Sequence, residues 1–188
     1  GLDLGKNFFW MNRFQMEVSA GSQKVTYLGG GMENWLYPIL ESNKVLQEAN
    51  GYYRMVSSIR GFGLNHRNGN SFSVINSEIR YKPIGSLFYL NTRSEFINNL
   101  LIVGFTDLAA VWYGKSPYSI KSPLNTNNIS TGAMDIVVYY RKQPVLLGMG
   151  FGFRTSIFGY YLKFDEAWGF DNGVWGQPFQ YLTIGKDF

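Results

Sequence analysis

The sequence predicts an all-β fold, namely the wall of an antiparallel transmembrane β-barrel with about seven strands and one long loop. Segments in which apolar and polar residues alternate recur along the 188 residues, as strands require. Aromatic residues (18%) and 22 glycines outweigh the few charged residues (16%), a mixture typical of sheets with aromatic girdles. The chain also ends on an alternating segment closed by an aromatic residue, Phe188.

The first long alternating segment begins at Phe8. From there to Ala20 the even-numbered positions are mostly apolar and the odd-numbered positions mostly polar, which predicts a strand. The segment 21–23 predicts a turn, and residues 24–35 predict a return strand, so we expect a long hairpin. Residues 38–70 then break the alternation, with a short helix expected near 42–49; loops this long are usually functional or disordered.

Alternation resumes after this loop. The expected strands cover residues 71–82, 100–113, 145–158, 160–169 and the segment from 178 onward. Residues 129–142 form either an additional strand or the continuation of a polar loop. Gly148, Gly150 and Gly152 share one face of their strand, and such glycines on an inner wall leave room for a segment packed against it.

The tryptophans fall mostly near the expected strand ends, where a barrel places its interfacial girdle. They are Trp10, Trp35, Trp112, Trp168 and Trp175. The terminal strand repeats the two-sided pattern, and its signal residues are Tyr181, Leu182, Ile184, Gly185 and Phe188.

Several function classes find no support in the composition. The chain has no cysteine, so disulfides, zinc–thiolate sites and thiol nucleophiles are excluded. The net charge of +4 is spread along the chain, so we expect no nucleic-acid partner. Asp165 and Glu166 are adjacent, so their carboxylates point to opposite strand faces and do not form the pair that a glycosidase needs. The sequence also has no G-x-S-x-G or H-E-x-x-H motif. We therefore expect no enzyme activity, catalytic residue, cofactor or metal. His66, the single histidine, is expected to be a solvated loop residue.

Four motifs in order along the chain resemble the BamA/TamA family of outer-membrane assembly barrels (the bacterial surface antigen family). Ile59-Arg-Gly-Phe62 resembles the family's V/I-R-G-F/Y loop motif, and Phe105-Thr-Asp-Leu-Ala109 its F-x-D-x-G strand motif, with alanine where glycine is usual. Residues 150–165 resemble the penultimate hairpin, and 179–188 the closing strand. The resemblance covers nearly the whole chain. It implies that residues 1–188 are the C-terminal half of a larger barrel domain, and that the long loop at 38–70, which carries the Arg-Gly-Phe motif, is folded inward.

The resemblance implies a site in which the long loop folds into the lumen and Arg60 pairs with Asp107. Glu78 shares the expected lumen face and is a second candidate acceptor. Gly61 and Phe62 are expected to shape the loop tip, with Phe62 packed near the inner-wall glycines. A charged pair inside a narrow lumen fixes a loop to the wall, because loss of one partner costs about 3–5 kcal/mol.

The function that the resemblance implies is insertion or secretion of other outer-membrane proteins, in the bacterial outer membrane and without a cofactor. The expected partners are the lipid bilayer, client outer-membrane proteins, the N-terminal part of the same barrel and periplasmic domains. Three alternatives stay open: a two-partner secretion pore, a barrel that anchors a fused enzyme, and a small complete β-barrel or sandwich that binds a ligand.

Overall fold

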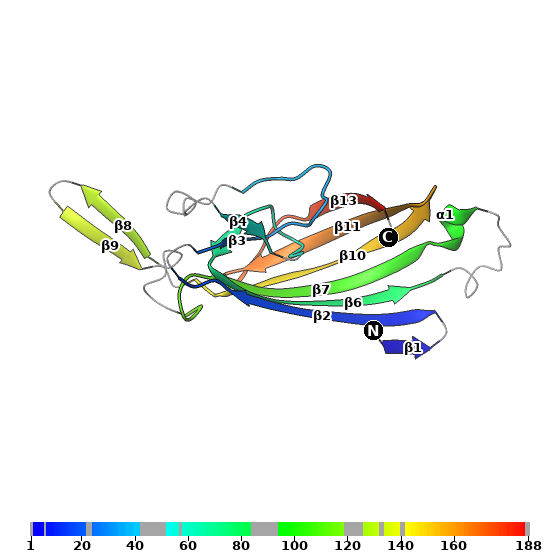
Figure 1. Ribbon diagram of the computed structural model, residues 1–188, viewed down its shortest axis with the longest axis horizontal. Coiled ribbons are helices and arrows are strands. Elements are labelled where there is room, and N and C mark those ends of the chain that lie inside the picture. Colours follow the sequence, from blue (N-terminus) through cyan, green and yellow to red (C-terminus); the bar gives the residue numbers. More distant parts are fainter. Residues whose placement is uncertain are drawn as a thin grey trace.

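The computed structural model describes residues 2–5, 7–21, 24–41, 52–56, 58–83, 94–118, 126–131, 134–139 and 142–186. These residues form an all-β structure dominated by one curved antiparallel sheet (Figure 1). The sheet has eight strands: β1 (Leu2–Gly5), β2 (Phe8–Val18), β6 (Ser71–Tyr81), β7 (Leu101–Trp112), β10 (Val145–Ile157), β11 (Tyr160–Asp171), β12 (Val174–Trp175) and β13 (Phe179–Lys186).

The strand order is β1-β2-β6-β7-β10-β11, and β12 and β13 both pair with β11. Within the described residues the sheet is open, with β1 at one edge and β13 at the other. The strands expected from alternation at 71–82, 100–113, 145–158, 160–169 and beyond 178 are all present. Between β10 and β11 the chain turns at Phe158 and Gly159, which both have positive φ, as a tight hairpin with this twist requires.

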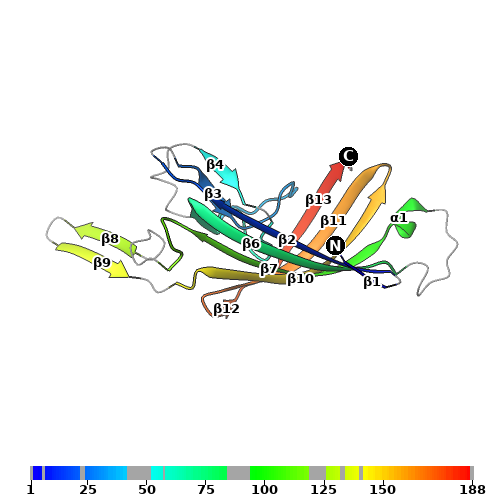
Figure 2. The same ribbon diagram turned by 60° about the horizontal axis from the view of Figure 1, so that its bottom comes forward.

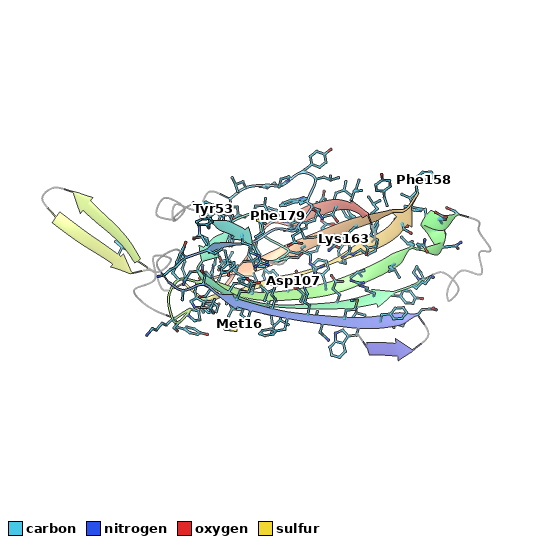
Figure 3. The ribbon with its side chains drawn as sticks, in the orientation of Figure 1. Met16, Tyr53, Asp107, Phe158, Lys163 and Phe179 are labelled. Carbon is cyan, nitrogen blue, oxygen red and sulfur yellow. The ribbon has the colours of Figure 1, made fainter. Side chains whose placement is uncertain are left out.

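The register gives the two faces of the sheet different chemistry. On the outer face, two apolar rows cross neighbouring strands: Phe14, Ile75, Leu108, Leu147 and Phe170 in one, and Phe8, Tyr81, Ile102, Phe153, Phe164 and Leu182 in the other. On the inner face, one row holds Arg13, Asn76, Asp107, Gly148 and Gly169, and another holds Arg80, Val103, Gly152, Asp165 and Tyr181. Figure 3 shows Met16 outside the curve and Lys163 inside it.

The described parts of the connection between β2 and β6 lie over the inner face, so this loop is folded inward (Figure 2). It contains a small three-stranded sheet of β4 (Tyr53–Met55), β3 (Thr26–Gly29) and β5 (Arg67–Gly69). Two buried apolar clusters join this connection to the wall. Tyr27, Ile59 and Phe62 pack with Phe72, Val74 and Val111, and Met32 and Trp35 pack with Phe105 and Tyr181. The core therefore lies between the loop and the inner wall.

The expected hairpin of residues 8–20 and 24–35 is wrong. β2 pairs along its whole length with β6, and β3 belongs to the small sheet instead. The reason is local: Gly30 and Gly31 adopt positive φ and turn the chain after only four strand residues, whereas β6 matches the eleven residues of β2.

The remaining described elements lie at the ends of the main sheet. A short helix, α1 (Glu95–Asn98), precedes β7, and a separate hairpin of β8 (Thr126–Thr131) and β9 (Met134–Tyr139) projects beyond the sheet (Figure 1). Most of segment 129–142 is thus strand. The helix expected at 42–49 lies outside the described residues. No described helix has the length and apolar composition needed to cross a membrane.

Candidate functional site

Arg60 lies at the tip of the inward loop with 1% of its surface exposed. Its Nε and Nη2 atoms each donate to a different oxygen of Asp107 on β7, both at 2.7 Å. Its Nη1 donates to Glu78 Oε1 on β6 at 2.7 Å and to Asp165 Oδ2 on β11 at 3.3 Å. The predicted contacts with Asp107 and Glu78 are therefore present, and a third carboxylate completes the site.

The geometry uses the planar fork of arginine. Two parallel bonds to one carboxylate fix the orientation of the guanidinium, and its remaining donor reaches the other two acids. The ring of Phe105 lies 3.5 Å from the guanidinium carbon and covers its face. Burial by itself would lower the pKa of Arg60, but the hydrogen bonds and charges of these carboxylates raise the pKa above its ordinary value.

A second cationic group shares the same acids. Arg154 on β10 is 1% exposed, and its two terminal nitrogens bond both oxygens of Asp165, Nη2 at 3.1 Å. Lys163 approaches Asp165 at 3.5 Å, and Arg80 donates to Glu78 at 2.8 Å. Alternation places all of these side chains on the inner face, but only the register across strands shows that they meet at one point.

The backbone of the loop tip is also held by the wall. The Tyr181 hydroxyl on β13 accepts from the N–H groups of Gly61 and Phe62, both at 2.9 Å, and donates to the Phe62 carbonyl at 2.7 Å. The backbone N–H of Arg60 donates to Asp107 at 3.1 Å. Tyr181 was predicted only as part of a terminal strand pattern, so its role as a loop anchor is a finding of the structure.

One of the three glycines on the inner face of β10 allows this close approach. A Cβ on Gly148 would collide with the Arg60 carbonyl oxygen, so the loop backbone lies directly on β10. Gly150 and Gly152 lie against neighbouring strands instead. A Cβ on Gly150 would collide with the Glu166 carbonyl oxygen of β11, and one on Gly152 with the Asp165 carboxylate.

Phe62 packs beside the inner-wall glycines, as predicted. It packs over Gly169 of β11, one strand further along the same row as Gly148. Gly61, between Arg60 and Phe62, has a φ of 92°, a conformation that glycine adopts without strain.

The terminal strand signal is only partly described. In β13, Tyr181 is buried on the inner face, whereas Ile184 on the other face is 45% exposed. Leu182 continues the second outer apolar row, and Gly185 pairs with Tyr161. Phe188 lies outside the described residues.

His66 is not a solvated loop residue, contrary to the sequence prediction. Its Nδ1 contacts Glu41 of the loop and its Nε2 contacts Asp171 at the end of β11, the latter at 2.9 Å. Burial opposes a raised pKa, but the bonds with Asp171 and Glu41 outweigh it and raise the pKa of His66. The His66 hydrogen bond also lowers the pKa of Glu41 against the opposing effect of burial. Because both partners are distant in sequence, alternation could not reveal this contact.

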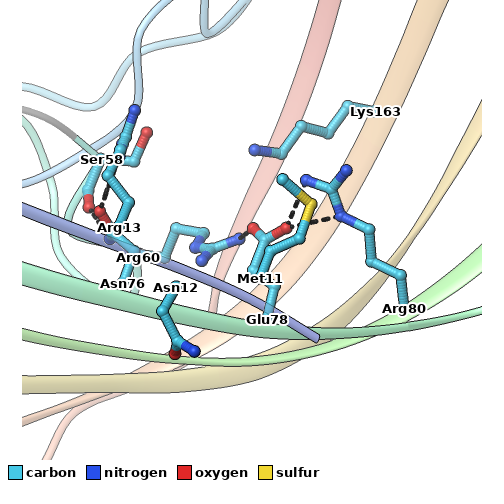
Figure 4. A pocket seen from close by; sticks show the side chains of 9 residues that line it. All are labelled: Met11, Asn12, Arg13, Ser58, Arg60, Asn76, Glu78, Arg80 and Lys163. Carbon is cyan, nitrogen blue, oxygen red and sulfur yellow. Dashed lines mark hydrogen bonds and ion pairs between the residues drawn. The ribbon is translucent and has the colours of Figure 1, made fainter. Parts of the chain in front are cut away.

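A polar cavity of about 230 Å³ lies beside the guanidinium (Figure 4). It is lined by Met11, Asn12, Arg13, Ser58, Arg60, Asn76, Glu78, Arg80 and Lys163. Its charged groups are already engaged with one another or with the wall, as the Arg80–Glu78 and Arg60–Glu78 pairs show. Among the described residues, no group of histidine and carboxylate side chains is arranged to hold a metal ion. The arrangement serves to hold a loop.

Comparison with protein-family models, with curated proteins and with solved structures gives no match for this chain. The functional argument therefore depends on the geometry of the wall and the loop.

We expect Arg60→Ala to lower the free energy of unfolding by about 3–5 kcal/mol, because it leaves the buried Asp107 carboxylate without its counter-charge. Arg60→Lys should recover only part of this loss, since one ammonium group cannot reproduce the fork. Urea titration measures both. Arg54→Ala is the control, because Arg54 is largely exposed and forms its ion pair with Glu17 at the surface; its loss should cost at most about 1 kcal/mol. Equal effects of Arg60→Ala and Arg54→Ala would contradict the buried site.

Gly148→Ala should lift the loop tip off β10, because its new methyl group would occupy the position of the Arg60 carbonyl. Trypsin should then cleave after Arg54 and Arg60 much faster than in the unmodified chain. Gly104→Ala is the matched control, since a Cβ at Gly104 on β7 meets nothing within 4 Å. Unchanged cleavage in Gly148→Ala would show that the loop does not lie on this wall.

The contact of His66 with Glu41 should give stability a defined pH window. A raised folded pKa means that His66 stabilises the fold below its ordinary value of 6.5, and that this contribution is lost as pH rises through the folded pKa. The lowered pKa of Glu41 means that its contribution is present above 4.5 and is lost as pH falls. The stability difference between the unmodified chain and His66→Gln should therefore be largest between about pH 4.5 and 6.5. A difference that does not vary with pH would refute the charged contact.

Proposed function

We propose that this chain is part of the transmembrane β-barrel of an outer-membrane assembly protein, which inserts or secretes other outer-membrane proteins. The observation that carries the proposal is the pair of opposite faces on one curved sheet. Its outer face exposes large apolar side chains, among them Phe14 (65%), Ile75 (45%) and Leu108 (41%). Its inner face holds a charged network and a folded loop.

An apolar outer face around a charged inner face fits contact with lipid better than contact with water. Monomeric soluble proteins rarely expose a large continuous apolar patch, whereas barrel strands alternate lipid-facing apolar residues with polar lumen-facing ones. The buried Arg60, Asp107 and Asp165 then face a lumen. The bilayer and the bacterial outer membrane are therefore the proposed partner and location.

The two open edges of the sheet support the proposal that further strands pair with it. In hydrocarbon, unpaired backbone groups on β1 or β13 would each cost several kcal/mol, so a membrane-embedded sheet needs further strands. We assign these to the N-terminal part of the same barrel, accompanied by periplasmic domains. The open sheet gives no support to the alternative of a small closed barrel.

The proposed mechanism uses β13 as one side of a seam. When the seam opens, the edge of β13 offers N–H and C=O groups with which a client strand can pair. The Arg60 site keeps the loop on the wall and Tyr181 on β13 in place while the edge is exposed. Pairing of this kind needs no catalytic residue, cofactor or metal. The secretion pore and the enzyme-anchoring barrel would share this wall, so the client assay below separates them.

Leu108→Arg should destabilise folding into a bilayer by about 2–4 kcal/mol, because it places a charge on the lipid-facing side of a central strand. Its cross-strand neighbours Ile75 and Leu147 are apolar and cannot pair with the new charge. Val174→Arg is the control, since Val174 is 68% exposed but lies in the short β12. Folding yield into vesicles across a urea series measures both. Equal tolerance of the two substitutions would contradict a lipid-facing sheet.

Client insertion tests the function itself. The full-length protein in vesicles should accelerate folding of an unfolded outer-membrane β-barrel client, measured by protease protection of the client. Arg60→Ala should slow this reaction, because the loop would no longer be held on the wall. A rate equal to that of protein-free vesicles would refute the proposal.

A further inference from the structure

A short segment of the inward loop pairs with the edge of β13 that faces away from β11. Trp35 and Thr183 form an isolated antiparallel bridge, and the Leu36 N–H donates to the Leu182 carbonyl at 3.0 Å. The other edge of β13 pairs with β11 from Phe179 to Lys186. The loop therefore adds a single bridge to the open edge of β13, which is the last strand of the sheet.

The Trp35 side chain occupies an aromatic site next to this bridge. It is 8% exposed, and its ring centroid lies 4.5 Å from that of Tyr181 and 6.4 Å from that of Phe179. Trp35 was predicted to join an interfacial girdle, and its burial against β13 overturns that prediction. Tyr181 is in turn fixed by the backbone of Gly61 and Phe62. The inward loop therefore both positions Tyr181, through Gly61 and Phe62, and fills the aromatic site with Trp35.

The contact is small enough to be exchanged. Its backbone part is one bridge with one hydrogen bond among the described residues, whereas the pairing of β13 with β11 extends over eight residue pairs. The loop is held separately on both sides, by the bridge of Gly31 with Ile59 and by that of Leu40 with Leu64. The positions on either side of Trp35 and Leu36 are therefore held by contacts that do not involve β13.

We propose that the edge of β13 and the aromatic site of Tyr181 and Phe179 bind an extended segment of another polypeptide that carries an aromatic residue, and that Trp35 and Leu36 occupy this site until that segment displaces them. The inference rests on the proposed function, because a client strand is the polypeptide that would add at this edge. The bridge shows what the site accepts: an antiparallel backbone that donates to the Leu182 carbonyl. The aromatic requirement follows from the area that such a ring buries, about 150–250 Å².

The first test removes the internal competitor. Leu36→Pro eliminates the N–H that bonds Leu182, whereas Leu36→Ala keeps it. The probe is a fluorescent peptide with the sequence of residues 33–39, and its partner probe has alanine in place of the tryptophan. A tethered segment competes at an effective concentration in the millimolar range. The full-length Leu36→Pro protein should therefore bind the tryptophan peptide about tenfold more tightly than Leu36→Ala, and the alanine peptide should bind neither well.

The second test closes the site and does not require the proline variant to fold. Paired residues of this kind have Cα atoms about 4.5 Å apart, within reach of a disulfide, and the chain has no cysteine of its own. The double substitution Trp35→Cys and Thr183→Cys should abolish peptide binding when oxidised and restore it when reduced. Thr183→Cys alone, which cannot form the bond, should bind the peptide equally under both conditions.

Client insertion, measured on the same preparations, separates the two proposals. Tight binding by Leu36→Pro and redox-controlled binding by the double variant support the inference. If both variants bind the peptide as the unmodified protein does while insertion proceeds, the inference is overturned and the proposed function stands. If no insertion occurs, the proposed function fails, even where the peptide binds at β13.

Discussion

The burial of one guanidinium organises this structure. Arg60 has 1% of its surface exposed, and a charge placed so far from water requires counter-charges with good hydrogen-bond geometry. Asp107, Glu78 and Asp165 supply them from three different strands. Meeting this requirement fixes the loop against the wall and fixes which face of each strand is the inner one. Because strand side chains alternate, the outer face is then determined as well.

The loop tip also links the middle of the sheet to its border. The guanidinium bonds β6, β7 and β11, the Arg60 carbonyl lies on Gly148 of β10, and Tyr181 of β13 holds the next two residues. A change at β13 is therefore felt by the loop through the Tyr181 hydroxyl. The same tyrosine forms the floor of the Trp35 site, so the fixed part of the loop and its exchangeable part meet at one residue.

Much of this could be predicted from the sequence because the period of two reports directly on strands. The strand expected at 145–158 and the face shared by Gly148, Gly150 and Gly152 followed from alternation. The contact of Arg60 with Asp107 was expected only from the resemblance of two motifs to those of a known family. The sequence could not show the side-chain contacts that depend on the register between strands distant in the chain. Asp165, Arg154 and His66 find their partners only after the sheet has aligned. Alternation placed Trp35 in a strand, because a pattern of apolar positions does not reveal the turn that Gly30 and Gly31 make with their positive φ.

A double-mutant cycle between Arg60 and Asp107 tests the central claim most directly. The unfolding free energies of the unmodified chain, Arg60→Ala, Asp107→Ala and the double variant would be measured in the same vesicles. If the buried pair holds the loop on the wall, the double variant should lose less stability than the sum of the single losses, by about 2–3 kcal/mol. Additive losses would contradict the account, because the two side chains would then contribute independently and the loop would have no fixed place on the inner wall.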